Sequence, residues 1–312
     1  MSDDKNSIGW IGCGRMGTAM AKRLVVADCD VTVTNRTRAK AEVLGELGAK
    51  VVDTPRDLAG CDVVFIMVSA DKELLAVTTG PNGILSNDDA APKVVVDCST
   101  VSSTTSALVR EALAKKNIEF LAAPVSGNPK VVASGKLTLA VSGTRGAFET
   151  VLPYLRELGH GVTYVGDDEV ARLVKICHNM LLGIVTQAMA EVTVLAERGG
   201  IPRSAFLEFL NNSVMGSTFS RYKTPAFVNL DFTPTFTPVL LRKDFDLGMA
   251  EAKALSVPMP VSALCTQIVI NAIGAGYADD DFAILLLEEA RGAGLVMESE
   301  NLVIDDGLGV KK

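Results

Sequence analysis

Hydrophobic residues in the first part of the chain, up to about Gly166, form short β-branched runs separated by stretches with helical spacing. This alternation is typical of a parallel sheet whose strands are joined by crossover helices. The pattern predicts strands at Ser7–Ile11, Val31–Asn35, Val63–Val68, Lys93–Asp97, Glu119–Ala122, Leu137–Ser142 and Val162–Val165. It predicts helices at Met16–Val26, Arg38–Leu47, Asp71–Thr78, Ser103–Lys115 and Gly146–Leu158. We therefore expect a doubly wound α/β domain of the Rossmann type.

After Gly166 the β-branched runs stop, and apolar residues recur with the 3.6-residue period of helices. The predicted helices are Glu169–Arg198, Arg203–Asn211, Pro238–Leu255, Pro260–Gly274 and Asp281–Gly292. The first of them would be about 45 Å long at ~1.5 Å per residue, so we expect it to join the two halves. With 312 residues, the chain is predicted to have an α/β domain at 1–166 and an all-helical domain at 167–312. The joining helix is apolar on most sides, which favours a homodimer or homotetramer built through the helical half.

Charge and composition exclude several function classes. The net charge of −7 argues against nucleic acid and membrane surfaces as partners, because both are anionic. The cysteines are dispersed singly and the chain has only two histidines, so neither a zinc site nor a disulfide framework is predicted. The first seven residues are polar and carry Asp3 and Asp4, unlike a secretory signal, which indicates a cytoplasmic protein. The apolar stretch Ile176–Ala190 is shorter than the roughly 20 residues that span a bilayer, and is interpreted as a buried helix.

A glycine-rich motif follows the first predicted strand and opens the first predicted helix. It reads Gly12-Cys13-Gly14-Arg15-Met16-Gly17, the GxGxxG pattern of dinucleotide-binding loops. In such loops the first glycine permits a tight turn, the second lets the diphosphate approach the backbone, and the third allows close packing of the helix on the strand. The helix N-terminus stabilises the anion. The alternative is a glycine-rich turn without a ligand.

The end of the second predicted strand bears on the choice between NAD and NADP. An NAD enzyme usually places Asp or Glu there to bind the ribose 2′-hydroxyl, but this chain has Asn35-Arg36-Thr37. Arg36 is suited to pairing with a 2′-phosphate, and Asn35 and Thr37 to donating hydrogen bonds to it. NADP(H) is therefore the predicted cofactor. The alternative is that Arg36 is a solvated residue at a helix start, like Arg38 and Lys40 nearby.

Lys175 is the most distinctive candidate for chemistry, because it lies within the apolar stretch Leu173–Val185. Lysine is rarely buried without a purpose, and burial lowers a lysine pKa towards neutrality, which suits proton exchange. Asn179 follows four residues later on the same helical face and is placed to orient a hydroxyl or the ammonium. The alternative is a lysine that reaches water from the edge of the helix. His178 precedes Asn179, but adjacent residues of a helix point about 100° apart, so His178 does not share the face of Lys175 and Asn179. It is interpreted as a core or interface residue.

Polar clusters also occur at three other places: Asp97-Cys98-Ser99-Thr100, Ser126-Gly127-Asn128 and Lys243-Asp244. The first two follow predicted strands, and ligands of doubly wound sheets bind beyond the carboxyl ends of the strands. Taken singly, each also has a structural explanation: a helix cap, a tight turn and a solvated ion pair. The chain has no GxSxG, HExxH or GxxxxGK[ST] motif, which leaves hydrolase and NTPase functions without support.

These motifs in this order resemble the β-hydroxyacid dehydrogenase family over nearly the whole chain. The resemblance implies an oxidoreductase that acts on a small carboxylate-bearing substrate. By that similarity Lys175 is the catalytic acid/base, Asn179 its orienting partner, and Ser126 and Gly127 hold the substrate carboxylate. The resemblance further assigns Asn128, Thr100, Phe236, Lys243 and Asp244 to the substrate site. It assigns Arg15, Met16, Val68, Ser69, Thr100 and Lys243 to the cofactor site, beside the residues Gly12, Gly14, Gly17, Asn35, Arg36 and Thr37 discussed above.

One departure from the family affects the substrate. The family's substrate loop usually reads SGG, whereas here Ser126-Gly127 is followed by Asn128-Pro129. Proline stiffens the loop and asparagine adds a polar side chain, so the substrate is expected to differ from those of other members. Two other functions remain open. An imine reductase would share the architecture and the NADP loop, although such enzymes generally lack the lysine, and a non-catalytic NADP-binding sensor would bind cofactor without turnover.

Overall fold

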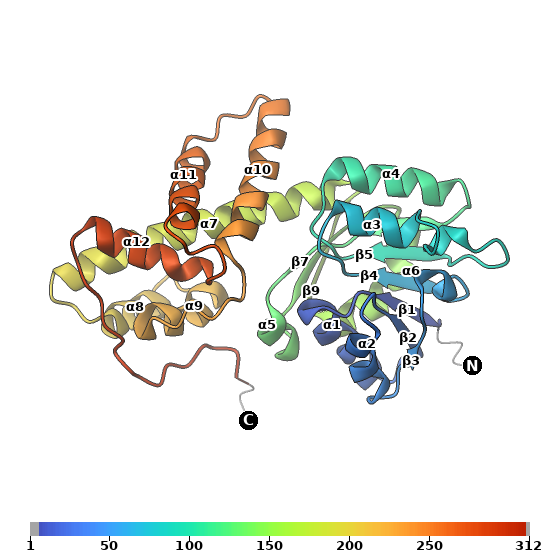
Figure 1. The fold of residues 1–312 in the computed structure, drawn as a ribbon, viewed down its shortest axis with the longest axis horizontal. Helices are drawn as coiled ribbons and strands as arrows, with labels where there is room; N and C mark the ends of the chain where they lie inside the picture. Colours follow the sequence, from blue (N-terminus) through green and yellow to red (C-terminus); the bar gives the residue numbers. More distant parts are fainter. Residues whose placement is uncertain (1–5, 310–312) are drawn as a thin grey trace. The chain divides into compact units, whose positions relative to one another are not determined.

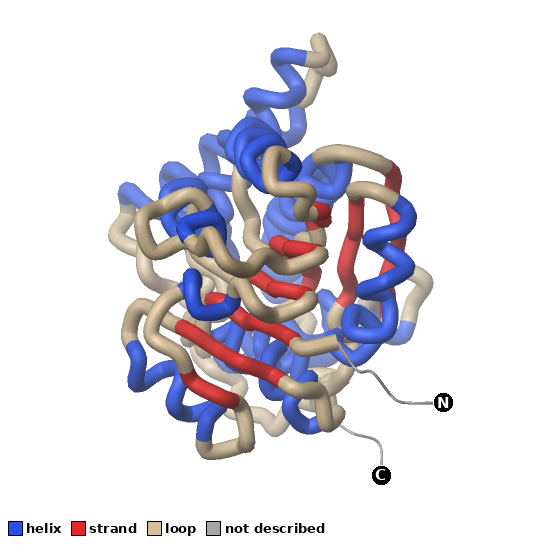
Figure 2. The backbone as a smooth tube through the Cα atoms, turned by 90° about the vertical axis from the view of Figure 1, so that its right-hand side faces the viewer, coloured by secondary structure: helices blue, strands red, loops and turns tan. Residues whose placement is uncertain are grey.

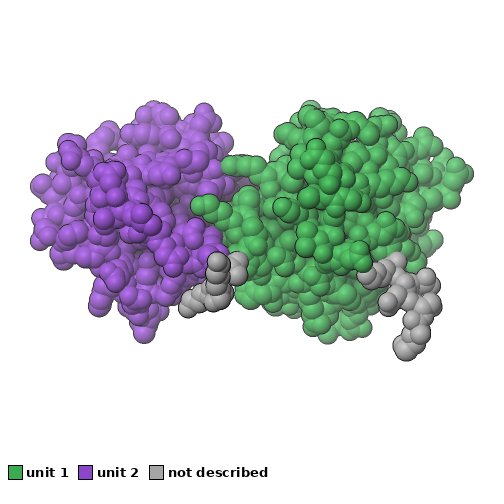
Figure 3. Space-filling view, turned by 90° about the horizontal axis from the view of Figure 1, so that it is seen from below, with its two compact units in different colours: residues 1–175 green, residues 176–312 purple. Residues whose placement is uncertain are grey.

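The computed structural model describes residues 6–309 and separates the chain into two compact units, Met1–Lys175 and Ile176–Lys312 (Figure 3). Their border falls inside helix α7 (Val170–Arg198), whereas the sequence analysis divides the domains at residue 166. An α/β unit followed by helices, with one long helix running on from the first into the second, confirms the expected fold class. The cytoplasmic location stays a prediction, since residues 1–5, on which it mainly depends, lie outside the described residues.

Unit 1 is built on one nine-stranded sheet in the order β3-β2-β1-β4-β5-β6-β8-β7, with β9 paired to β8. Its strands are β1 (Ile8–Ile11), β2 (Val31–Thr34), β3 (Lys50–Val51), β4 (Val63–Ile66), β5 (Val94–Asp97), β6 (Glu119–Ala122), β7 (Val125–Ser126), β8 (Thr138–Ser142) and β9 (Gly161–Gly166). The first six pair in parallel, but β8 runs antiparallel to both β6 and β7, so the sheet is mixed rather than wholly parallel. The connection between β7 and β8 spans only residues 127–137, which is too short for the crossover that a parallel pair needs.

Helices cover both faces of the sheet of unit 1, and strands lie between them in Figure 2. The helices are α1 (Arg15–Val26), α2 (Arg38–Gly45), α3 (Asp71–Thr78), α4 (Ser103–Ala114), α5 (Pro129–Ala133) and α6 (Arg145–Leu158), with 3-10 turns at Pro55–Leu58 and Ile84–Ser86. Successive residues of β4 point to opposite cores: Phe65 packs in the core of α1, α2 and α6, and Ile66 in the core of α3 and α4. Burial on both faces explains why these strands read as continuous apolar runs.

Unit 2 is helical (Figure 1). After α7 come α8 (Arg203–Asn212), α9 (Thr218–Asn229), α10 (Pro238–Ala254), α11 (Pro260–Gly274), the 3-10 turn Phe282–Ile284 and α12 (Leu285–Gly292). Proline stands at the first position of α10 and α11, where its missing N–H costs nothing. Helix α9 was not predicted from the sequence, because its interior contains Pro225 and its hydrophobic pattern is weak. Its start is defined instead by a capping box of Ser217 and Ser220.

Helices α7 and α10 pack closely because each presents a glycine to the other. A Cβ on Gly248 would lie 2.0 Å from Met180 Sδ, and one on Gly183 would lie 2.6 Å from the Phe245 ring. By length and composition alone α7 is long and apolar enough to cross a membrane, whereas its apolar stretch Ile176–Ala190 was expected to be too short for a span. This is weak support for a span, because 56% of its most apolar window is buried inside the protein, as in a core helix.

Candidate active site

The glycine-rich loop has the geometry that a dinucleotide requires. Gly12 has a φ of +99°, and a Cβ there would lie 2.2 Å from the Met67 carbonyl oxygen. A Cβ on Gly17 would lie 1.9 Å from the Gly12 carbonyl oxygen, so α1 packs against β1 at a distance that only glycine permits. Around Gly14, by contrast, no atom lies within 4 Å of a built Cβ, and the residue is exposed at the start of α1. The loop therefore leaves open space at the position where a diphosphate would approach the backbone and the helix N-terminus.

Two alanine substitutions separate ligand binding from folding in this loop. We expect Gly17→Ala to lower the thermal unfolding temperature, because its Cβ meets backbone that cannot move aside. Gly14→Ala has space for its Cβ, so we expect unchanged stability without cofactor but weaker binding of NADPH. Thermal unfolding and fluorescence titration with NADPH measure the two effects. Normal NADPH affinity in Gly14→Ala would contradict the placement of the diphosphate.

Asn35 links the glycine-rich loop to the segment that follows β2. Its Oδ1 accepts a hydrogen bond from Cys13 N at 2.9 Å, and its Nδ2 donates to Thr37 O at 2.9 Å. The amide is thus engaged in holding the two loops together, a role that differs from the direct cofactor contact predicted for it. Thr37 is exposed at the N-cap of α2.

The two arginines of this segment differ in availability. Arg38 forms ion pairs with Glu42, at 2.9 Å, and with Asp53. The guanidinium of Arg36 is exposed and makes no hydrogen bond or ion pair with any residue between 6 and 309. A guanidinium without an internal carboxylate partner is better suited to an external phosphate, because no existing ion pair has to be broken.

The loop after β5 is buried and holds the loop after β4. Asp97 and Ser99 are completely buried, and Asp97 Oδ1 accepts a hydrogen bond from Ser99 N at 3.1 Å. Ser99 Oγ accepts one from Val68 N at 2.9 Å. That bond takes the place of a sheet bond and explains why β4 ends at Ile66, two residues earlier than predicted. The cap of α4 is Ser102, within the stretch Ser99–Ser103 that the sequence offered as a helix cap.

Arg172, in the first turn of α7, completes this arrangement. It is 1% exposed, its NH2 lies 2.6 Å from Asp97 Oδ2, and its NH1 donates to Ser99 O at 2.7 Å. The sequence analysis did not single out Arg172, because an arginine near the start of an apolar helix is usually solvated. Only the order of the strands brings it to Asp97. Of the predicted cofactor residues nearby, Ser69 is exposed and Thr100 is half-buried.

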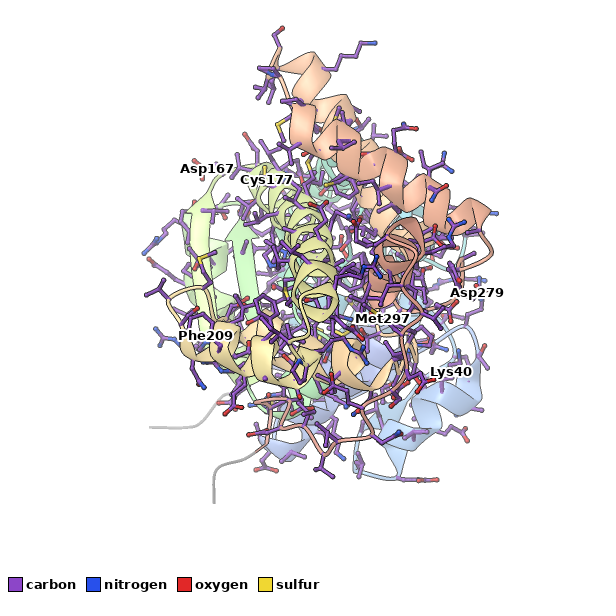
Figure 4. All side chains as sticks on the ribbon, turned by 90° about the vertical axis from the view of Figure 1, so that its left-hand side faces the viewer. Lys40, Asp167, Cys177, Phe209, Asp279 and Met297 are labelled. Atoms are coloured by element: carbon purple, nitrogen blue, oxygen red, sulfur yellow. The ribbon has the colours of Figure 1, made fainter. Side chains whose placement is uncertain are left out.

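Lys175 follows Arg172 by one helical turn and is the last residue of unit 1. It is half-buried rather than fully buried. In the next turn of α7, Cys177 (Figure 4) is exposed, and so is His178. His178 is therefore not a core residue. Its Nδ1 lies 2.9 Å from Asn179 Oδ1.

In unit 2, Asn179 is joined to the predicted Lys243-Asp244 step. Asn179 and Asp244 are both buried, and Asn179 Nδ2 donates to Asp244 Oδ2 at 2.5 Å. Asp244 Oδ1 lies 3.5 Å from Lys243 Nζ. Next to this pair in sequence, Gly248 of α10 lies against Met180 of α7. Asp244 is thus not part of a solvated ion pair, and the bond to Asn179 was not predicted. Phe236 packs edge-on against Phe282 in the core of this unit.

The predicted substrate loop is partly regular structure. Ser126 belongs to β7 and pairs with Thr138, and α5 begins at Pro129. Asn128 is the N-cap of α5, its Oδ1 accepting a hydrogen bond from Val131 N at 3.0 Å. Gly127 has a φ of +145°, and a Cβ there would lie 2.8 Å from Val131 Cγ1. The Asn-Pro departure therefore starts a short helix rather than merely stiffening a loop.

The residues predicted for the site thus fall into two groups, one within each unit. In unit 1 the glycine-rich loop, the Val68 loop and the Asp97–Thr100 loop follow β1, β4 and β5, which are neighbours in the sheet. In unit 2 the group consists of Asn179, Lys243 and Asp244. Within residues 6–309, no group of three or more His, Cys, Asp or Glu side chains is placed to hold a metal ion. The glycine-rich loop at the edge where β1, β4 and β5 end is typical of nicotinamide-dependent oxidoreductases.

Comparison with known proteins supports this class. Residues 7–166 match the family described as the NAD binding domain of 6-phosphogluconate dehydrogenase, and residues 170–288 match the NAD-binding domain of NADP-dependent 3-hydroxyisobutyrate dehydrogenase. Glyoxylate/succinic semialdehyde reductase 2, chloroplastic, of Arabidopsis thaliana is 30% identical over 90% of this chain and 78% of its own length. The 2-(hydroxymethyl)glutarate dehydrogenase of Eubacterium barkeri is 31% identical over 91% and 96%.

A solved structure agrees with both matches. The 3-hydroxyisobutyrate dehydrogenase of Salmonella typhimurium superimposes with a TM-score of 0.81, at 27% identity over 91% of this chain and 99% of its own. The chain belongs to the β-hydroxyacid dehydrogenase family, as its motifs indicated. It is an NAD(P)-dependent hydroxyacid dehydrogenase.

Proposed function

We propose that the protein interconverts a small β- or γ-hydroxyacid and the corresponding aldehyde or keto acid, using NADP(H) and Lys175 as the general acid/base. The observation that carries this proposal is the position of Lys175. It lies in unit 1, one turn after a residue bonded to the loop beyond β5, in the same unit as the glycine-rich loop. A lysine held in this way has the proton-transfer chemistry that carbonyl reduction needs.

In this reaction the bound cofactor supplies or accepts the hydride. Lys175 donates a proton to the substrate oxygen as it becomes an alkoxide, and removes that proton in the oxidative direction. Ser126 and Gly127 hold the substrate carboxylate, which fixes the reacting carbon. Orienting the reactants in this way contributes several kcal/mol, on the order of the effects seen in intramolecular reactions. Asp244 holds Asn179 in one orientation through the 2.5 Å bond between them.

NADP(H) rather than NAD(H) is proposed from the segment after β2. Of the two arginines there, Arg36 has no ion pair with the described residues 6–309, while Arg38 is held by Glu42 and Asp53. The arrangement provides one guanidinium for a 2′-phosphate and no carboxylate directly after β2 for a 2′-hydroxyl.

The experiment that tests the function is a panel of substrates followed through the absorbance of the reduced cofactor. Aldehyde acids and imines are assayed with NADPH and NADH in parallel, and hydroxyacids with NADP+ and NAD+ in parallel. The names of the relatives direct the choice of glyoxylate, succinic semialdehyde and 3-hydroxyisobutyrate, with a cyclic imine as the rival substrate. Turnover of a hydroxyacid or aldehyde acid supports the proposal. Faster reduction of the imine would identify an imine reductase, and tight NADPH binding without turnover on any of them would identify a sensor.

We further propose a homodimer or homotetramer formed through unit 2. On α7 the residues Leu181, Val192 and Leu195 form an exposed apolar stripe, with Leu195 73% exposed. A stripe of this kind on a helix marks an interaction surface. Light scattering should give a mass of two or four chains, and Leu195→Glu should reduce it. A monomeric mass for the unaltered protein would rule the assembly out.

A further inference from the structure

Arg172 has a set of contacts that structural stability alone does not explain. Its side chain is 1% exposed, and all three of its guanidinium nitrogens are engaged. NH2 pairs with Asp97 at 2.6 Å, NH1 donates to Ser99 O at 2.7 Å, and Nε donates to Ser106 Oγ at 3.0 Å. The partners come from the end of β5, the loop after it, and α4. One side chain of α7 is thus fixed to three separate segments of unit 1.

A buried ion pair of this kind adds little net stability, because the cost of removing both charges from water offsets their attraction. It does impose a geometry. The guanidinium is planar and its donors form a rigid fork, so all of these acceptors are satisfied in only one orientation of the side chain. The first turn of α7 therefore has a fixed rotation and a fixed height relative to the end of β5.

The same contacts extend to the cofactor side of the sheet. Asp97 also accepts a hydrogen bond from Ser99 N, and Ser99 Oγ accepts one from Val68 N, two residues beyond the end of β4. Strand β4 pairs with β1, which leads into the glycine-rich loop. A continuous chain of hydrogen bonds thus connects Arg172 with a backbone group next to the strand that carries the cofactor loop.

We propose that Arg172 is a positioning residue for Lys175, with Asp97 as its partner. Lys175 lies three residues after Arg172 on the same rigid helix, so fixing the first residue fixes the Cα position of the second. Proton transfer depends steeply on geometry, and a displacement of about 1 Å costs on the order of 100-fold in rate. This inference rests on the proposed role of Lys175 as acid/base.

A double-mutant cycle tests the proposal. Arg172→Lys retains a positive charge near Asp97 but loses the fork to Ser99 and Ser106, so we expect kcat to fall about 10- to 100-fold. In the Lys175→Ala background, where no ammonium remains to be positioned, the same substitution should lower the residual rate less than about 3-fold. An equal fractional loss in both backgrounds would show that Arg172 does not act through Lys175, and would overturn the proposal.

Arg203 provides a matched control. It is also 1% exposed and bonded to a carboxylate and to carbonyl oxygens, those of Glu197, Phe227 and Val228, but it lies in unit 2. We expect Arg203→Lys to lower the unfolding temperature about as much as Arg172→Lys while leaving kcat within about 2-fold. If the control lowers kcat as far as Arg172→Lys does, the effect belongs to the loss of any buried arginine, and the positioning role fails.

A milder variant covers the case in which Arg172→Lys does not fold. Ser106→Ala removes the acceptor of Arg172 Nε, together with the hydrogen bond that Ser106 Oγ donates to Glu169, and leaves the charge pair with Asp97 in place. A fall in kcat of several fold that disappears in the Lys175→Ala background supports the proposal, and an unchanged kcat overturns it. Normal turnover by Lys175→Ala itself would refute the proposed function. If Lys175→Ala loses most of its kcat, but the Arg172 or Ser106 substitution lowers kcat by the same factor in both backgrounds, only the positioning role is refuted.

Discussion

Lys175→Ala should lower kcat by on the order of 10² to 10⁴-fold while leaving the affinity for NADPH unchanged. The reason is that general acid–base catalysis contributes about this much to a proton-transfer step, whereas the glycine-rich loop that is proposed to bind the diphosphate is a separate part of unit 1. Initial rates on the best substrate of the panel and fluorescence titration with NADPH measure the two quantities on the same protein.

Two further variants show whether the proton or merely the charge matters. Lys175→Arg keeps a positive charge, but a guanidinium does not give up its proton in a protein, so we expect it to be nearly as impaired as the alanine variant. Lys22→Ala removes an exposed lysine from α1 and should keep full turnover. High activity of Lys175→Arg would mean that the residue stabilises charge without exchanging a proton.

Arg36→Ala should lower kcat/KM for NADPH about 10- to 150-fold and change kcat/KM for NADH little. A hydrogen bond to a charged group is worth about 1.5–3 kcal/mol, and only NADPH carries the 2′-phosphate that would lose it. The matched control is Arg38→Ala, two residues on, whose guanidinium is engaged by Glu42 and Asp53. Arg38→Ala should change the ratio of kcat/KM for NADPH to kcat/KM for NADH by less than about 3-fold. The ion pairs that it removes are made with the protein's own carboxylates at the solvent-exposed surface.

The outcome for the unaltered protein also bears on the cofactor. If it prefers NADH, or if Arg36→Ala lowers kcat/KM for NADPH and for NADH equally, the guanidinium of Arg36 does not bind the 2′-phosphate. An effect of Arg38→Ala equal to that of Arg36→Ala would instead assign the phosphate to both arginines.

Much of the fold of unit 1 follows from local sequence. Phe65 and Ile66 belong to a strand buried on both faces, so the run is apolar throughout and its position is evident, and α3 was predicted with its exact ends. The exceptions depend on distant partners. Val68 was predicted to continue β4, but its N–H donates to Ser99 Oγ thirty-one residues away, which no local pattern indicates.

For unit 2 the sequence predicted the helices that have clear periodicity and missed α9, whose start depends on the capping box of Ser217 and Ser220. The Asn128-Pro129 departure was recognised, but its consequence was not. Asparagine is a preferred N-cap and proline a preferred first residue, and together they start α5.

By itself the sequence determined the α/β and helical halves and the family, and it predicted the cofactor loop, because periodicity and the GxGxxG spacing are local properties of the chain. Only the tertiary structure decided that Asp97 belongs with Arg172 and Asn179 with Asp244, since these partners are far apart in sequence and meet through strand order and helix packing. It also decided which arginine after β2 is free of ion pairs, because the competing carboxylate of Asp53 comes from beyond the next strand. Ion pairing and burial depend on which residues are neighbours in space, so the partners of these residues could be assigned only from the fold.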